Sequence, residues 1–299
     1  MREIDTCIVG ATGLVGQTML KVLEEYDFPV GRLKLLASKR SAGKVCVFKG
    51  KKHTVQELTE NSSAWREDSD IPLIVPEVNL EDYTLNRLIA NPNCSTIQAV
   101  LPLKALQEAF GIQRVNYSTY QAVSGSGQKG IQDLYRTQND EEPALYPYNI
   151  SQTVIPEIDQ PLENGYTKEE QKMINETRKI LHQPDLPVSA TCVRVPIENG
   201  HGVSVAVQLQ KEFTIEEVKE CLSQFPGIQL EDDLAAHKYP TSILAKGTDT
   251  VYAGRIRKDT SLENGLLFYT TADNIRKGAA ANAVQIAVAL MQKIAEVAR

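Results

Sequence analysis

One of the five cysteines stands in a setting that suits chemistry. Cys94 follows an Asn-Pro-Asn turn and opens an apolar run that predicts a helix. A thiol at the N-terminus of a helix lies at the positive end of the helix dipole, which favours the thiolate, the form that attacks carbonyl and acyl carbons. The alternative is a small core residue, since most free cysteines are buried hydrophobes. That alternative fits Cys7, Cys46, Cys192 and Cys221, which lie in apolar β or helical patterns.

A nucleophilic thiol needs a base, and His201 is the histidine whose surroundings suit that role. It lies in a glycine-flanked stretch that predicts a turn between two strands, whereas His53, His182 and His237 lie in a charged β-run, at a helix end and in a loop. Arg194, seven residues earlier, ends an otherwise apolar strand. An arginine there can bind a carboxylate or phosphate bidentately. The alternative for Arg194 is a surface salt bridge.

The N-terminal segment predicts the element that would bring a cofactor to such a site. Residues 4–10 predict a strand and residues 11–26 predict a helix, because apolar residues recur there at helical spacing. Gly10, Gly13 and Gly16 fall at the junction. Bare backbone N–H groups at a helix N-terminus can hold a pyrophosphate, so this context predicts a dinucleotide site. An ordinary β–α turn that needs glycines for close packing is the alternative.

The end of the second predicted strand, at residues 32–38, indicates which dinucleotide is used. A carboxylate there would bind the adenosine ribose, but the sequence is "ASKRSAGK", with Ser38, Arg40 and Ser41 and no acid. Cations and hydroxyls suit a 2′-phosphate, so the pattern favours NADP over NAD. A solvated basic loop would give the same pattern.

The predicted cofactor domain is short of one crossover. Residues 44–58 predict two short β-runs, and only "TENSSAWREDSD" separates Leu58 from the next apolar run, "IPLIVPEVN". A doubly wound sheet needs a further strand, helix and strand before its fold is complete. The sequence therefore predicts a sheet with a missing piece.

The rest of the chain alternates less regularly. A helix is predicted from Cys94 to Gly111, a strand and a Gly/Ser loop follow it, and another helix is predicted at about 127–137. Residues 138–166 predict irregular structure. Thr167 and the glutamate three residues later have capping-box spacing, which predicts a helix over 167–181.

From residue 187 on the sequence is rich in β-runs: "PVSATCVRVP", "GVSVAVQLQ", "TVYAGRIRKD" and "GLLFYTT". A helix at about 214–223 interrupts them, and residues 274–298 predict one long amphipathic helix. The predicted fold class is α/β, with a Rossmann-type NADP-binding domain followed by an α+β domain with a mixed sheet.

Composition limits the classes of partner. The 299 residues carry a net charge of −6, with 42% hydrophobic and 23% charged residues. A nucleic-acid binder usually has a basic excess, and no apolar run approaches the roughly 20 residues that span a bilayer. We therefore expect neither nucleic acid nor membrane as a partner. The charged N-terminus does not resemble a signal peptide, and five scattered cysteines favour a reducing cytoplasm without disulfides or a metal site.

Several motifs occur together and in a recognisable order. They are "GATGLVG", "NPNCSTIQ", "STYQAVSGSG", "EEQKMINETRKIL", "ATCVRVP" followed by "GH", "GRIRKD" and "DNIRKGAAANAVQI". They cover the chain from end to end and resemble aspartate-semialdehyde dehydrogenases of the bacterial type. The "NPNCSTIQ" motif separates this family from glyceraldehyde-phosphate dehydrogenases and N-acetyl-glutamyl-phosphate reductases.

The resemblance implies an oxidoreductase. It would convert β-aspartyl phosphate to aspartate β-semialdehyde with NADPH, in lysine, threonine and methionine biosynthesis. Cys94 would be the nucleophile, His201 the acid/base, and Gln121 would orient the acyl intermediate. Arg194 would bind the substrate carboxylate and Glu169 its amino group.

The remaining site residues also follow from the resemblance. Lys172 would reach the phosphate together with Asn93 and Arg66. The spacing gives independent support, because residues 169 and 172 are i,i+3 and share a helix face. The implied cofactor-binding residues are Gly10, Ala11, Thr12, Gly13, Leu14, Val15, Gly16, Ser38, Arg40, Ser41 and Asn274.

The resemblance also implies how the chain is divided. Residues 1–93 and 279–299 would form the dinucleotide-binding domain, with the last helix returning to it. Residues 94–278 would form the catalytic domain, which would hold a homodimer together.

The chain departs from the family at two places. About 30 residues are absent near 58–61 and a shorter stretch is absent near 137–146. Loss of a central strand leaves its neighbours unpaired, and each buried unpaired backbone group costs on the order of 1–3 kcal/mol. We therefore expect poor NADP binding or poor folding from a chain that lacks this segment. Two alternatives remain: a related acyl-phosphate reductase with another carboxylate substrate, and an inert paralogue or interaction subunit.

Overall fold

The N-terminal part of the chain forms a small parallel sheet. The computed structural model describes residues 3–58, 70–83 and 88–297. Strands β1 (Ile4–Val9), β2 (Val30–Ala37) and β5 (Gln56–Glu57) pair in the order β1-β2-β5. Helix α1 (Leu14–Glu25) connects the first two, as the apolar spacing predicts. The 3₁₀ turn η1 (Lys39–Ser41) and the hairpin of β3 (Val45–Phe48) and β4 (Lys51–Thr54) precede β5.

Strand β1 is an edge strand in the part of the chain that the structure describes. It pairs with β2 on one side and with no strand on the other. Its side chains alternate in burial, and Val9 is 49% exposed. Cys7 is exposed, so the expectation that it is a core residue is wrong. In a doubly wound fold this strand lies in the interior of the sheet, and without an outer neighbour its side chains lose their cover.

The middle of the chain leads from the small sheet to the nucleophile. Residues 59–69 and 84–87, including the predicted site residue Arg66, lie outside the described residues. The short helix α2 (Pro76–Asn79) and the turn η3 (Leu80–Asp82) follow, with a single parallel bridge between Leu73 and Ala90. Helix α3 (Cys94–Phe110) then begins at the predicted cysteine and ends before Gly111, whose φ of 71° explains why glycine stands there.

A six-stranded mixed sheet forms the larger part of the molecule. Its strand order is β7-β6-β8-β11-β10-β9, with parallel pairs at β6·β7 and β9·β10 and antiparallel pairs elsewhere. The strands are β6 (Ile112–Gln121), β7 (Val188–Arg194), β8 (His201–Leu209), β9 (Ile228–Leu230), β10 (Val251–Asp259) and β11 (Gly265–Ala272). Five of them fall in predicted β segments, and the three-residue β9 was not predicted.

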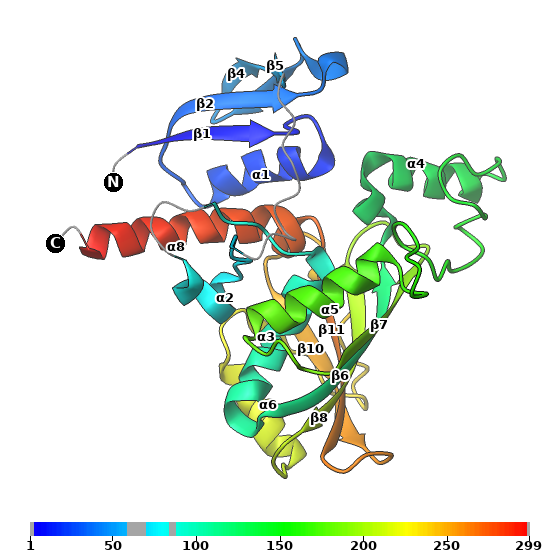
Figure 1. Cartoon of the computed structure of the whole chain (residues 1–299). Helices are drawn as coiled ribbons and strands as arrows, with labels where there is room; N and C mark the ends of the chain where they lie inside the picture. Colours follow the sequence, from blue (N-terminus) through cyan, green and yellow to red (C-terminus); the bar gives the residue numbers. More distant parts are fainter. Residues whose placement is uncertain (1–2, 59–69, 84–87, 298–299) are drawn as a thin grey trace.

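Helices cover one face of this sheet. Helices α3, α5 (Lys168–Ile180) and α6 (Ile215–Gln224) pack on it, as Figure 1 shows. Thr167 caps α5 and forms the predicted capping box with Glu170. On the other face Tyr120 and Tyr269 lie with their ring centroids 6.1 Å apart, and Tyr120 is 43% exposed. One face is thus packed into the core and the other is only half covered.

The segments between these elements lie at one end of the large sheet. The turn η4 (Val123–Ser126) and helix α4 (Gly127–Gln138) follow β6, and residues 139–166 contain no helix or named strand, as predicted. The four-residue helix α7 (Ser242–Ala245), which was not predicted, precedes β10.

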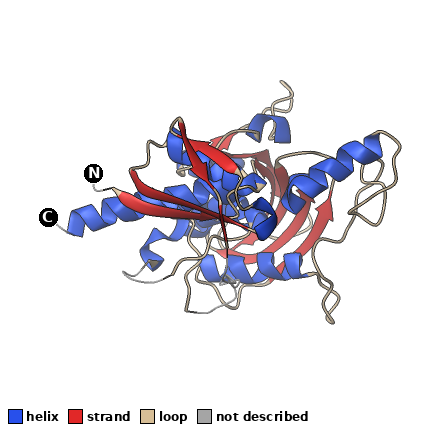
Figure 2. Ribbon diagram, turned by 90° about the horizontal axis from the view of Figure 1, so that it is seen from above, coloured by secondary structure: helices blue, strands red, loops and turns tan. Residues whose placement is uncertain are grey.

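The last helix returns to the N-terminal part. The predicted single helix is divided into a π-helical turn, η5 (Arg276–Ala280), and α8 (Ala281–Val297). Ala280, Ala281 and Val284 pack in one hydrophobic cluster with Ile8 and Leu20. Figure 1 shows α8 passing beside α1, between the small sheet and the large one, and Figure 2 shows the same arrangement from above. The two-part α/β class is confirmed. In the described residues no helix is long and apolar enough to cross a membrane.

Candidate active site

A cavity of about 650 Å³ lies where the small sheet, α3 and the large sheet meet. The glycine turn and α1 line one side of it, and α3, β6, β7 and α5 supply residues on the other side. It collects these predicted site residues: Gly10, Gly13, Leu14, Val15, Gly16, Asn93, Cys94, Gln121, Glu169, Lys172, Arg194 and Asn274. Residues more than 180 positions apart in the sequence therefore share one space.

Asn93 places Cys94 at the first turn of α3. Its side-chain oxygen accepts hydrogen bonds from the backbone N–H groups of Ser95 and Thr96, at 2.9 and 3.2 Å. Its own N–H donates to Glu176 at 2.7 Å. The predicted helix start is therefore present, and the cap holds Cys94 at the positive end of the helix dipole.

Polar side chains from α5 and β6 surround this turn. The Asn93 amide donates to Glu169 at 2.8 Å, and the Gln121 amide donates to the same carboxylate at 3.3 Å. The ammonium of Lys172 lies 3.6 Å from Glu169 and 2.6 Å from Asp159. Burial raises the pKa of Asp159, but the hydrogen bond and positive charge of Lys172, together with the backbone N–H of Gln160, outweigh it and hold that pKa below its usual range. Glu169 is 6% exposed, so its charge is balanced by neighbours and not by bulk water.

His201 is the first residue of β8, not part of a turn as the sequence suggested, and it is fully buried. Its Nδ1 accepts a hydrogen bond from the backbone N–H of Ala122 at 3.0 Å, which places the ring proton on Nε2. Nε2 has no hydrogen-bond partner among the described residues. A Cβ built on the cavity residue Gly125 would lie 3.4 Å from Nε2, so the ring borders the cavity at this glycine. Burial, reinforced by the positive charge of Arg194, lowers the pKa of His201 well below its usual value.

Arg194 ends β7 and is 5% exposed, so the surface salt-bridge alternative does not apply. Its Nη1 donates to the carbonyl of Ala122 at 2.7 Å, and its Nε has no acceptor among the described residues. Arg194 lines the cavity, and a buried guanidinium there suits an anionic ligand such as a carboxylate.

The glycine turn has the backbone geometry that a dinucleotide needs. Gly10 has a φ of +76°, and a Cβ on Gly16 would lie 2.3 Å from the Gly10 carbonyl oxygen. The chain therefore passes closer to α1 than any side chain would permit. Ala11 is buried beneath the turn, and Thr12 follows it.

The other predicted cofactor residues are placed as follows. Ser38, Arg40 and Ser41 lie in or beside η1, after the carboxyl end of β2, with Ser38 and Arg40 exposed. Asn274 is buried beside the cavity, where it exchanges hydrogen bonds with Ser124 and accepts one from the Gly200 N–H at 2.9 Å.

Two models of known protein families match this chain. The family described as "Semialdehyde dehydrogenase, dimerisation domain" matches residues 103–277, and "Semialdehyde dehydrogenase, NAD binding domain" matches residues 5–61. The aspartate-semialdehyde dehydrogenase of Aquifex aeolicus is 47% identical over 331 residues, covering 96% of this chain and 97% of the relative. The chain belongs to the aspartate-semialdehyde dehydrogenase family. The Bacillus subtilis enzyme is 44% identical, covering 97% of this chain and 98% of the relative.

Solved structures agree with this membership. Aspartate-semialdehyde dehydrogenase II of Vibrio cholerae, solved in complex with ASA, matches with a TM-score of 0.91 and 41% identity, covering 98% of this chain and 99% of that one. The aspartate-semialdehyde dehydrogenase of Candida albicans with NADP matches with a TM-score of 0.74, and at 24% identity it supports the fold alone.

The relatives also bear on the missing segments. An alignment of 331 residues is longer than the 299 residues of this chain, so the Aquifex relative contains stretches that have no counterpart here. This agrees with the three-stranded N-terminal sheet in the described residues.

Three residues of this aspartate-semialdehyde dehydrogenase family member were not foreseen as part of the site. Asp159 pairs with Lys172, Glu176 holds the backbone of Asn93, and Gly278 lies against Cys94, where a Cβ would approach the Cys94 Cβ to 2.8 Å. Asp159 lies in an irregular stretch, so no periodicity pointed to it. Gly278 had a signal, since a glycine within a helical pattern often marks close packing.

The burial of His201 predicts how stability depends on pH. The unfolded imidazole titrates near 6.5, whereas the folded pKa is well below that value, so the unfolded state binds more protons in between. This contribution to the free energy of unfolding is complete above about pH 6.5 and is lost as the pH falls towards the folded pKa. Denaturant titrations between pH 5 and 8 measure it, and His201→Asn is expected to flatten the curve. An equally steep fall in His201→Asn would assign the effect to other groups.

Proposed function

We propose that the chain catalyses the NADP-dependent reductive dephosphorylation of β-aspartyl phosphate to aspartate β-semialdehyde, a step of lysine, threonine and methionine biosynthesis. The observation that carries this proposal is the shared cavity, in which Cys94 at the start of α3 faces the same space as the glycine turn and Arg194. Membership of the family supports the same reaction.

Cys94 acts as the nucleophile. Its thiolate attacks the acyl carbon of β-aspartyl phosphate, the carbon–oxygen bond to phosphate breaks, and a thioester forms on Sγ with release of phosphate. A reduced nicotinamide dinucleotide held at the turn from Gly10 to Gly16 would supply the hydride for the thioester carbon. His201 donates a proton from Nε2 to the oxygen of the resulting hemithioacetal and takes it back when the C–S bond breaks, which releases the aldehyde and regenerates the thiolate. Because burial lowers the pKa of His201, the resting ring is neutral and carries its proton on Nε2, the atom from which it is donated to the oxygen.

The surrounding residues bind and orient the substrate. Arg194 binds the α-carboxylate and Glu169 binds the amino group. Gln121, whose amide lies 3.3 Å from Glu169, orients the acyl group. Lys172 and Asn93 reach the phosphate, and Arg66 completes this set from the part of the chain outside the described residues. The Lys172 contacts to Glu169 and Asp159 support a cation that exchanges partners when the substrate enters.

The glycine turn supports NADP as the cofactor. The turn from Gly10 to Gly16, including Ala11, Thr12, Leu14 and Val15, receives the pyrophosphate at the N-terminus of α1. Ser38, Arg40 and Ser41 take the 2′-phosphate, since hydroxyls and a cation stand there with no acid. Asn274 lies beside the nicotinamide end of the cavity.

We also propose the assembly and the domain division. A homodimer forms through the half-covered face of the large sheet, supported by exposed Tyr120 and by the family description of this region. Residues 1–93 and 279–299 form the cofactor domain and 94–278 the catalytic domain, supported by the packing of α8 on α1. Within the proposed cofactor domain, the apolar residues at 71–90 also pack on α3, which belongs to the catalytic domain. None of the five cysteines, all of which lie in the described residues, forms a disulfide, and this supports a cytoplasmic location.

An assay in the reverse direction tests the function. We expect phosphate-dependent reduction of NADP⁺ by aspartate β-semialdehyde, followed as NADPH absorbance, with no reduction when phosphate is omitted. We expect weak NADPH binding in a fluorescence titration, because β1 has no outer neighbour in the described sheet. Mass spectrometry would first establish that the purified chain has the printed sequence. Reduction with N-acetyl-glutamate semialdehyde alone would favour the related reductase, and no turnover with either aldehyde would contradict the proposal.

A further inference from the structure

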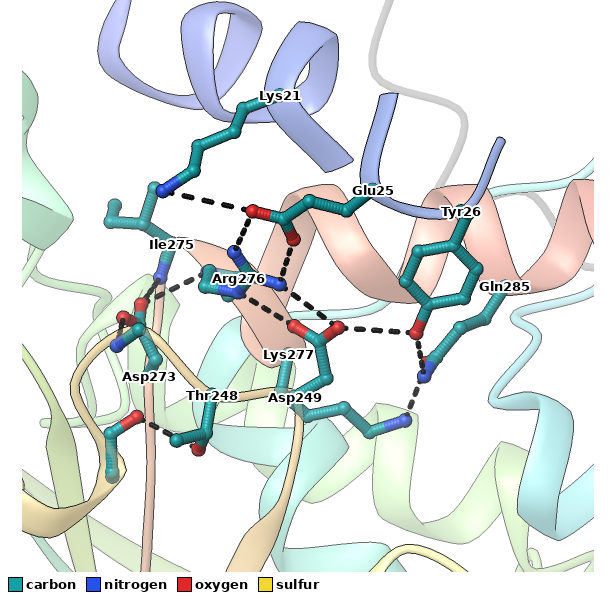
Figure 3. Close-up of polar contacts among 12 residues, drawn as sticks. Lys21, Glu25, Tyr26, Thr248, Asp249, Asp273, Ile275, Arg276, Lys277 and Gln285 are labelled. Carbon is teal, nitrogen blue, oxygen red and sulfur yellow. Dashed lines mark hydrogen bonds and ion pairs between the residues drawn. The ribbon is translucent and has the colours of Figure 1, made fainter. Parts of the chain in front are cut away.

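Outside the cavity, one arginine holds two carboxylates that are far apart in the sequence. Arg276 is 9% exposed, and its Nε and Nη2 donate to Asp249 at 2.8 and 3.1 Å. Its Nη1 and Nη2 donate to Glu25 at 3.2 and 2.6 Å. Figure 3 shows the guanidinium between the two acids. Four charge-assisted hydrogen bonds on one planar group fix both partners in direction as well as distance.

The two carboxylates belong to different parts of the fold. Glu25 is the last residue of α1, the helix that begins at the glycine turn. Asp249 lies in the loop that leads into β10 of the large sheet. Arg276 itself begins the π-helical turn η5, which links β11 to α8. A single side chain thus connects the end of α1, the loop before β10 and the turn that leads into α8.

A second set of contacts extends this connection. The Tyr26 hydroxyl donates to Asp249 at 3.1 Å and accepts from Gln285 of α8 at 3.1 Å. Lys277, which is fully buried, donates to Gln285 at 2.9 Å and to Glu77 of α2 at 2.6 Å. The far end of α1 is therefore tied to η5 through Glu25 and to α8 through Tyr26, and Figure 3 shows the contacts among Tyr26, Gln285 and Lys277.

The turn that Arg276 begins lies against the nucleophile. A Cβ on Gly278 would lie 2.8 Å from the Cys94 Cβ, so the backbone of η5 packs directly on Cys94. Ile275, Gly278 and Ala279 line the cavity. Asp273 fixes the start of the turn by accepting from the N–H groups of Ile275 and Arg276, at 2.9 and 3.0 Å. A movement of η5 would therefore move one wall of the site.

We propose that Arg276 is a positioning residue, which, by holding Glu25 and Asp249 together, sets the place of α1 and the bound nicotinamide relative to Cys94. It touches neither substrate nor cofactor. The proposal rests on the proposed function, because it assumes that hydride reaches a thioester on Cys94. Misplacement of reacting groups by about 1 Å can reduce a rate on the order of 10²-fold.

Three variants test the role. Glu25→Gln removes the charge that reaches Arg276 from α1. Arg276→Lys keeps a cation but cannot bind two carboxylates bidentately. Lys21→Gln is the matched control, because Lys21 lies on the same helix, 3.7 Å from Glu25, with a side chain that is 70% exposed. Thermal midpoints and the far-UV spectrum first establish that each variant is folded.

Two readouts follow. The first is the isotope effect on kcat/KM with NADPH deuterated at the transferred position, using β-aspartyl phosphate as substrate. The second needs no turnover: the rate at which iodoacetamide alkylates Cys94, with and without saturating NADPH, followed on the Cys94 peptide by mass spectrometry. In the unmodified protein we expect bound NADPH to slow alkylation.

In folded Glu25→Gln and Arg276→Lys proteins we expect kcat to fall by about 10- to 100-fold, the isotope effect to rise and protection of Cys94 by saturating NADPH to weaken. The alkylation rate without NADPH should stay within about twofold, and Lys21→Gln should match the unmodified protein. Folded variants with an unchanged isotope effect and full protection would overturn the positioning role. An unmodified protein with no turnover would instead contradict the proposed function.

Discussion

Cys94→Ala is expected to abolish the reduction of NADP⁺ by aspartate β-semialdehyde, with kcat lower by about 10⁴-fold or more. Alanine keeps the Cβ that packs on Gly278 and leaves the Asn93 cap intact, so the variant should fold normally. What it loses is the only atom at this position that can form a thioester. The measurement is the steady-state rate, together with a search for acylated enzyme by intact-mass spectrometry.

The matched control is another cysteine in a helix. Cys221→Ala changes a half-buried thiol of α6, whose Sγ donates to the Ala105 carbonyl away from the cavity, and should keep nearly full activity. Substantial turnover by Cys94→Ala would rule out Cys94 as the nucleophile. A parallel loss in Cys221→Ala would point to a general effect of cysteine replacement.

His201→Asn is expected to lower kcat by about 10²- to 10⁴-fold while leaving the affinity for NADPH unchanged. The asparagine oxygen can accept the Ala122 N–H in place of Nδ1, so the backbone contact has a substitute. No group remains at Nε2 to carry a proton to and from the hemithioacetal oxygen. The check is a pair of measurements on one preparation: kcat and KM across pH 6–9, and an NADPH titration.

A surface histidine provides the comparison. His237→Asn changes an exposed residue of the loop before β10 and should leave both parameters unchanged. If His201→Asn lowered NADPH affinity and thermal stability in proportion to activity, its role would be structural. An activity within about threefold of the unmodified protein would remove His201 from the chemistry.

Local signals in the sequence predicted most of the fold. The Thr167 and Glu170 capping box, the glycine at the end of α3 and the apolar spacing of α1 each act within a few residues, and the structure confirms all three. Cys94 could be placed at a helix start from the Asn-Pro-Asn turn alone. Its role together with Gln121 and Glu169 came from the family resemblance. The Gln121–Glu169 and Asn93–Glu169 contacts span 48 and 76 positions, and contacts at such separations leave no local pattern in the sequence.

The remaining differences have physical reasons. Cys7 lies in an apolar β pattern, but burial depends on a neighbouring strand, and within the described part of the chain β1 has one on only one side. The π-helical turn at Arg276 has the same helical periodicity in the sequence as α8, and it packs against Cys94, a contact between distant parts of the chain that leaves no local pattern. The ties of Arg276 to Glu25 and Asp249 join residues 251 and 27 positions apart.

The unpaired side of β1 has a consequence for how this protein behaves in concentrated solution. A strand edge presents a row of N–H and C=O groups that can template pairing with another chain, and here exposed Cys7 and Val9 lie along the same strand. The nearest residues offer few of the lysines or prolines that usually blunt such an edge. We therefore expect amide hydrogen exchange to be faster in the strands of the small sheet than in those of the six-stranded sheet. We also expect association at high concentration to begin at β1.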